Sequence, residues 1–276
     1  MVRTFSNEPG GRDPAAPRPY AGTAITPAAA RFNLRDFGGY GVVGGGTVRR
    51  GALYRSAQLC RAGVTERGLL NRLGIAVVID FRGTDESGAS PGVAFDGYAG
   101  RVARFDATDS LVPQAIGALA DCANARQVTE HFREVYRRLA YSSRFIGSLA
   151  AYFDILSSSG EPTLAHCFAG KDRTGLAAAL AQTALGVHRD DVLDEYLLTN
   201  RAGEERIASG LEQLSLPPHL HIREDILVQS MMVEPVYLDA AFETIAWRDG
   251  SVDRYFSDVL HVDRRGIERM RANFVA

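Results

Sequence analysis

One segment of the chain places a thiol, a guanidinium and a hydroxyl at close spacing. Residues 166–175 read HCFAGKDRTG, so that five residues separate Cys167 from Arg173, and Thr174 follows directly. A short loop of this kind can curl until its main-chain N–H groups face one point, and a helix that starts at its end adds the positive end of its dipole. The segment therefore predicts a cradle for a phosphate-sized anion. The residues expected to bind it are Phe168, Ala169, Gly170, Lys171, Asp172, Arg173 and Thr174.

Cys167 is predicted to be a nucleophile. The amides and the helix dipole that attract an anion also stabilise a thiolate, which lowers the pKa of the thiol below its free value of about 8.5. Arg173 can hold two phosphoryl oxygens with its planar fork while charge develops on them. The predicted reaction has two steps: the sulfur attacks phosphorus and expels an alcohol or phenol, and water then hydrolyses the cysteinyl phosphate. Neither step requires a metal or another cofactor.

Both steps need a proton carrier, and the sequence offers two carboxylates for it. Asp172, inside the loop, is the first candidate, and Asp80, at the end of a short apolar segment, is the second. Thr174 can donate to the departing thiolate, while His166 is expected to orient the loop. Lys171, the only lysine in a chain that otherwise uses arginine, adds a positive charge at the rim that suits a multiply phosphorylated ligand.

The segments around the loop predict the elements that position it. Residues 163–166 are expected to form a strand, and residues 174–185 a helix that ends at Gly186. A second buried strand is predicted at 75–80, after a helix at 65–73. Strands that alternate with helices, followed by a helical C-terminal third, predict an α/β fold with a central, mostly parallel sheet flanked by helices.

Length, composition and charge exclude several classes of function. The chain has 276 residues, of which 46% are hydrophobic, and we expect a flexible N-terminal arm at 1–29 and one domain at 30–276. A net charge of −2 offers no field for nucleic acid or for an anionic membrane. The three cysteines form no CxxC pair, which argues against a zinc site or a disulfide framework.

No apolar stretch is long enough to predict stable membrane insertion, and the N-terminal residues lack the apolar core of a signal peptide. We therefore expect a cytoplasmic address, and export without a cleavable signal stays open. The sequence does not set the oligomeric state.

The loop HCFAGKDRTG resembles the signature loop of cysteine-dependent protein tyrosine phosphatases. Its Gly-Lys-Asp-Arg core is similar to that of the atypical bacterial tyrosine/serine phosphatases, which also hydrolyse phosphoinositides. Further similar blocks follow the family's order over about residues 31–274: NLRDFGG at 33–39, LYRSAQL at 53–59, IDFRGTDE at 79–86 and the segment 250–270. The resemblance implies a protein tyrosine phosphatase-like fold with a helical lid after the signature helix, within about residues 201–232.

The acid loop of the conventional tyrosine phosphatases, with its Trp-Pro-Asp sequence, is not recognisable here, so the choice between Asp172 and Asp80 stays open. Arg35 and Asp36, in the first of these blocks, are expected either to contact substrate or to form an internal ion pair that fixes the N-terminal segment. Arg82, like Asp80, is expected either to support the loop or to touch the ligand.

Three functions fit these observations. The leading one is hydrolysis of phosphotyrosyl protein, extending to phosphoserine or phosphoinositides. The second is the same chemistry on a small phosphorylated metabolite, such as a nucleotide-like or sugar phosphate of a biosynthetic pathway. The third is an inactive phosphate-binding module, against which the presence of Cys167, Asp172 and Arg173 argues.

Overall fold

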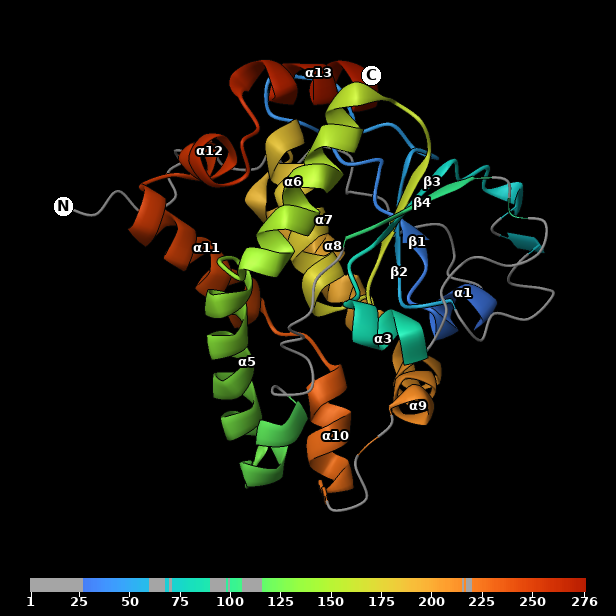
Figure 1. The fold of residues 1–276 in the computed structure, drawn as a ribbon, viewed down its shortest axis with the longest axis vertical. Helices are drawn as coiled ribbons and strands as arrows, with labels where there is room; N and C mark the ends of the chain where they lie inside the picture. The colour runs from blue at the N-terminus through green and yellow to red at the C-terminus, as the bar shows by residue number, and fades with distance from the viewer. Residues whose placement is uncertain are drawn as a thin grey trace.

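A sheet with strand order β1-β2-β5-β3-β4 lies at the centre of the molecule (Figure 1). Strand β5 pairs in parallel with β2 and with β3, and β3 also pairs in parallel with β4. Strand β1 pairs antiparallel with β2. The predicted mostly parallel α/β architecture is confirmed, as are the strands predicted at 163–166 and 75–80. The strands are β1 (Arg35–Asp36), β2 (Leu53–Ser56), β3 (Val77–Asp80), β4 (Arg101–Arg104) and β5 (Thr163–His166).

The computed structural model describes residues 27–59, 68–69, 71–89, 98, 100–105, 116–214, 216 and 220–276. The arm predicted at 1–29 lies outside these residues, except for its last three, which begin helix α1 (Pro27–Arg31). The helix predicted at 65–73 is described only in part, with residues 68, 69, 71 and 72 helical.

The three central strands end at one edge of the sheet. The register pairs His166, the last residue of β5, with Ser56 of β2 and with Asp80 of β3. Every residue of these strands is buried, including the charged Arg55 of β2 and His166 of β5. Because open α/β sheets bind ligands beyond the carboxyl ends of their strands, this edge is where the site is expected.

Helices surround the sheet and form most of the C-terminal third (Figure 1). Helix α7, which follows β5, is buried along most of its length because its alanines allow neighbouring elements to approach closely. It ends, as predicted, at Gly186, whose φ of 93° favours glycine. The helices are α3 (Thr84–Ala89), α5 (Ala125–Leu139), α6 (Ser143–Ser158), α7 (Asp172–Leu185), α8 (Arg189–Arg201), α9 (Gly203–Gln213), α10 (Glu224–Met231), α11 (Pro235–Asp249), α12 (Val252–Arg254) and α13 (Arg264–Phe274).

Two of these helices, α9 and α10, fall in the segment 201–232 for which the resemblance implies a lid. Helix α10 packs against α5 and α9, and α9 packs against α1. Among the described residues, no helix is both long and apolar enough to span a bilayer.

Candidate functional site

Carbonyl groups of the loop between β5 and α7 accept hydrogen bonds from residues outside the loop. The amide of Gln58 donates to Phe168 O at 2.9 Å, and the Asn33 side chain donates to Gly170 O at 3.0 Å. The guanidinium of Arg55 donates to the same Gly170 oxygen at 2.8 Å. Because the C=O and N–H of a trans peptide point in opposite directions, outward carbonyls direct the adjoining amides toward the inside of the loop. This orientation of the carbonyls is the one that an anion cradle requires.

Gly170 is required at the turn of this loop. Its φ is +64°, in the left-handed region, and a Cβ at this position would lie 2.5 Å from backbone atoms of Ser56 and Ala57. Both constraints exclude a side chain. The loop is therefore pressed against the end of β2, which places its open side away from the sheet.

Cys167 lies at the base of the loop and is buried, with 3% of its surface exposed. It lines a cavity of about 110 Å³ together with residues of the loop. Helix α7 begins at Asp172, and the side chain of Lys171 at the N-cap position makes no capping hydrogen bond. The first amides of this helix are therefore available to an anion next to the Cys167 sulfur.

Arg173 is fixed by a carboxylate that the sequence analysis did not single out. Its two terminal nitrogens lie 2.7 and 2.8 Å from the two oxygens of Glu86, and Nη1 also donates to Phe81 O at 3.0 Å. Burial lowers the pKa of Arg173, but the charge of Glu86 outweighs burial and raises it. The guanidinium is thus charged and held in one orientation. The signal for Glu86 was its position at the end of the block 79–86, shortly after β3.

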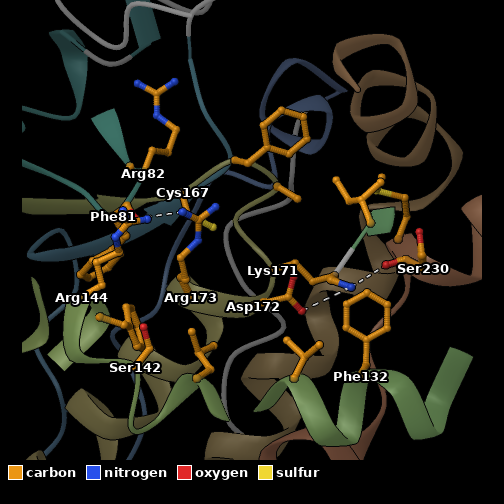
Figure 2. Close-up of a pocket in the computed structure, with 18 of the residues that line it drawn as sticks. Phe81, Arg82, Phe132, Ser142, Arg144, Cys167, Lys171, Asp172, Arg173 and Ser230 are labelled. Atoms are coloured by element: carbon orange, nitrogen blue, oxygen red, sulfur yellow. Dashed lines mark hydrogen bonds and ion pairs between the residues drawn. The ribbon is translucent and has the colours of Figure 1, made fainter. Parts of the chain in front are cut away.

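The sequence predicted that Lys171 places its charge at the rim of the loop. The structure differs, because this side chain is buried. It is 2% exposed, and its ammonium donates to the backbone oxygens of Ser230 and Met232 at the end of α10. The same nitrogen lies 3.7 Å from the ring centroid of Phe132 and 3.3 Å from Asp172 Oδ1 (Figure 2). Burial lowers the pKa of Lys171, although Asp172 opposes this effect. The difference arises because α10, far away in sequence, covers this residue.

Of the two candidate acids, Asp172 lines the cavity and Asp80 is not among its lining residues. Asp80 is 1% exposed, and its two oxygens accept from Arg82 at 2.9 and 2.8 Å. Burial raises the pKa of Asp80, but His166 and Arg82 outweigh burial and lower it from 3.8 to about 2. The carboxylate of Asp80 is therefore ionised and bonded to Arg82 beneath the loop.

His166 and Arg82 are the neighbours of Asp80, and of these three residues Arg82 alone lines the cavity. His166 is completely buried, with Nε2 at 3.7 Å from Asp80 and Nδ1 at 3.2 Å from Cys167 O. Burial lowers the pKa of His166. The guanidinium of Arg82 turns away from Cys167 (Figure 2) and donates to Gln58 as well as to Asp80. Asp80 and its partners His166 and Arg82 therefore connect the edge of the sheet to the loop.

Arg35 forms the internal ion pair that was one of its two expected roles, and its partner is Glu195 of α8. Arg35 Nε and Arg55 Nη1 each lie 2.7 Å from one oxygen of Glu195, and all three side chains are buried. Asp36 instead accepts from the amides of Gly38 and Gly51. Nothing in the sequence singled out Glu195, which lies in a helix rich in charged residues.

The cavity above the loop has largely apolar walls. Its polar groups outside the loop are Arg82, Ser142, Arg144, Ser148 and Ser230, and most of the remaining wall is aromatic or aliphatic. A site with an anion cradle at its base and such walls can bind a phosphate ester whose organic part is apolar. The apolar wall includes Phe81, Leu119, Phe132, Val135, Leu139, Phe145, Leu214 and Met231.

Known proteins resemble this chain over most of its length. A model described as the tyrosine phosphatase family matches residues 26–276. A protein of Cupriavidus necator named as a tyrosine-protein phosphatase is 33% identical over 250 residues, which are 88% of this chain and 86% of that protein. The triple specificity protein phosphatase PtpB of Mycobacterium tuberculosis is 28% identical over 276 residues, 90% of this chain and 98% of PtpB. A crystal structure of P. aeruginosa TpbA in complex with phosphotyrosine matches 81% of this chain and 94% of its own, at 20% identity and a TM-score of 0.27.

The buried pairing of Glu195 with two arginines predicts a large loss of stability in Glu195→Gln. This change keeps the shape of the side chain but leaves Arg35 and Arg55 without their shared counter-charge, so the free energy of unfolding should fall by about 3–5 kcal/mol. Urea unfolding followed by circular dichroism measures it. Glu134→Gln is the matched control, because Glu134 makes only exposed pairs on α5 and should change the same quantity by less than about 1 kcal/mol. Equal losses in both variants would contradict the assignment.

The pKa of Asp80 predicts part of the acid sensitivity of the fold. Because its pKa of about 2 lies below the ordinary 3.8, the ionised carboxylate stabilises the folded state above pH 4, and this contribution of about 2 kcal/mol is lost as the pH falls from about 4 to 2. Asp80→Asn should therefore reduce the slope of unfolding free energy against pH in this window. The measurement is denaturant unfolding at several pH values, and an unchanged slope argues against the pairing.

Proposed function

The chain belongs to the tyrosine phosphatase family, and we propose that it removes phosphate from phosphotyrosyl proteins through a covalent intermediate on Cys167. The observation that carries this proposal is the position of Cys167 at the base of a loop with outward carbonyls, beside the uncapped start of α7. Arg173 lines the same cavity, with its fork oriented by Glu86. These groups bind and polarise a phosphoryl group without a metal.

The first step transfers the phosphoryl group to sulfur. The thiolate of Cys167 attacks phosphorus, the bond from phosphorus to the phenolic oxygen breaks, and Asp172 gives its proton to the departing oxygen. Asp172 is the better placed acid because it lines the cavity while Asp80 is occupied by Arg82. The loop amides and Arg173 stabilise the charge on the equatorial oxygens, which is the main contribution that a protein makes to phosphoryl transfer.

The second step releases inorganic phosphate. Water attacks phosphorus, Asp172 now accepts a proton from this water, and the sulfur leaves as thiolate. The hydroxyl of Thr174 is buried and has no hydrogen-bond partner within the part of the chain that the structure describes. It is therefore available to donate to the departing sulfur.

An aromatic leaving group suits this cavity better than a sugar or a nucleotide does. Phe81, Phe132 and Phe145 lie in its wall and can pack against an aromatic ring. We therefore place phosphotyrosine ahead of small metabolites. Since the relative PtpB is named a triple specificity phosphatase, the proposal extends to phosphoserine and phosphoinositide substrates.

The segment 201–232 is proposed to act as the lid of this site. Leu214, Ser230 and Met231, which belong to this segment, line the cavity above Cys167. The contact of Lys171 with the end of α10 links the lid to the catalytic loop. Substrate of protein size needs this contact to open.

The nucleophile is tested by Cys167→Ser. Serine keeps the size of the side chain but is not ionised at neutral pH, so phosphate release from a phosphotyrosyl peptide should fall at least about 1000-fold. Binding of the peptide, measured by calorimetry, should remain. Cys122→Ser is the matched control, since Cys122 is a free thiol outside the cavity. Release at the wild-type rate by Cys167→Ser refutes the covalent mechanism.

The acid is tested by the leaving-group dependence of Asp172→Asn. A phenol of high pKa needs a proton as it departs, whereas p-nitrophenol does not, so kcat should fall about 100-fold or more for phenyl phosphate and much less for p-nitrophenyl phosphate. Steady-state phosphate release with both substrates measures this difference. Equal reduction with both substrates excludes Asp172 as the acid.

A further inference from the structure

A second cationic group lines the cavity on the side away from Lys171. Arg144 is the second residue of α6, and Ser142 immediately precedes this helix. Both belong to the wall of the cavity that contains Cys167. Figure 2 shows Arg144 and Ser142 on one side of Arg173, with Lys171 and Ser230 on the other. The cavity therefore has a positively charged group on both sides of the catalytic loop.

Arg144 differs from the other cations of the cavity because no acidic side chain in the described part of the chain pairs with it. Arg173 forms an ion pair with Glu86, and Arg82 forms one with Asp80. Lys171 donates to carbonyl oxygens at the end of α10. For Arg144, the nitrogen Nη2 is completely buried and has no hydrogen-bond partner within the described part of the chain. A buried N–H of a charged group without an acceptor is unfavourable, so a ligand that brings an acceptor to this nitrogen gains free energy by binding here.

The position of Arg144 on α6 makes this charge more unfavourable. The N-terminal end of a helix is positive, and α6 has no acidic residue in its first turn to offset Arg144. Ser142 occupies the N-cap position, but its side chain makes no capping hydrogen bond. The hydroxyl and the guanidinium thus both line the cavity as donors, and neither is used by the helix.

We propose that Arg144 and Ser142 form a second anion subsite, which binds a phosphate or carboxylate on the same molecule whose phosphoester occupies the Cys167 loop. The preferred substrates are aryl phosphates that carry a second oxyanion. Phe81 and Phe145 line the same cavity and provide apolar surface for the ring that joins the two anions. This inference rests on the proposed function, and it assigns recognition of a second anion to Arg144 in place of Lys171, whose ammonium is already bonded.

The test compares phenyl phosphate with 3-phosphonophenyl and 4-phosphonophenyl phosphate, in which the added phosphonate cannot be hydrolysed. The wild-type protein should favour at least one of the two phosphonate-bearing probes by about tenfold in kcat/KM, as expected for a charge-assisted, two-point contact. Arg144→Gln should bring this ratio to about one. Arg144→Lys, which keeps the charge but not the planar fork, should restore part of it.

Arg138→Gln is the matched control, because it removes the same charge from an exposed position on α5 that does not line the cavity. This variant should keep the wild-type ratio, which separates a local contact from a general effect of net charge. The preference should also survive 0.15 M salt, since a partly buried pair is screened less than an exposed one. A ratio of one in the wild type, or a preference that remains in Arg144→Gln, overturns the proposal.

Binding to Cys167→Ser separates this inference from the proposed function. Calorimetry should show that 3-phosphonophenyl or 4-phosphonophenyl phosphate binds more tightly than phenyl phosphate, and that Arg144→Gln in this background removes the difference. If this pattern is found but the wild type hydrolyses none of the probes, the proposed function fails and the second subsite stands. If the wild type hydrolyses phenyl phosphate but the pattern is absent, the subsite fails alone.

Discussion

The orientation of the loop carbonyls is the constraint on which the site depends. Two side chains, Asn33 from the turn before β1 and Arg55 from β2, donate to the one oxygen of Gly170. Arg55 is itself held by Glu195, which also binds Arg35. Removing three charged side chains from water is costly, and such clusters are poor stabilisers compared with apolar packing. Their effect here is positional: they fix the carbonyl of Gly170 and with it the orientation of the adjoining peptide plane.

A carboxylate also fixes the cation of the catalytic loop, Arg173. Glu86 binds both terminal nitrogens of Arg173, so this guanidinium does not have to be ordered when a ligand arrives. The sheet supplies the frame for both sides, because β2, β5 and β3 end together and the loop starts from the middle strand. Preorganised donors of this kind lower the barrier to transfer without reorganisation during the reaction.

The local parts of this arrangement could be predicted from the sequence, and the distant parts could not. The strand, loop and helix around Cys167 are contiguous, so their periodicity and glycines indicated the cradle directly. Glu195 is 140 residues from Arg55 and 160 from Arg35, and as one acidic residue among several in α8 it has no local signal. The same holds for Arg144, which resembles any helix-surface arginine until the fold brings α6 to the cavity. The sequence singled out Lys171 but not its surroundings, which depend on α10, 59 residues away.

The burial of Lys171 also determines how the protein responds to covalent chemistry. Apart from the amino terminus, this residue provides the only primary amine of the chain, since all other basic positions are arginine or histidine. Its nitrogen is enclosed by the end of α10, the ring of Phe132 and Asp172. Reagents that selectively acylate amines therefore have one side-chain amine as their target, and this amine is shielded while α10 stays in place. The extent of acylation at this one nitrogen is a direct count of the molecules in which α10 has moved away.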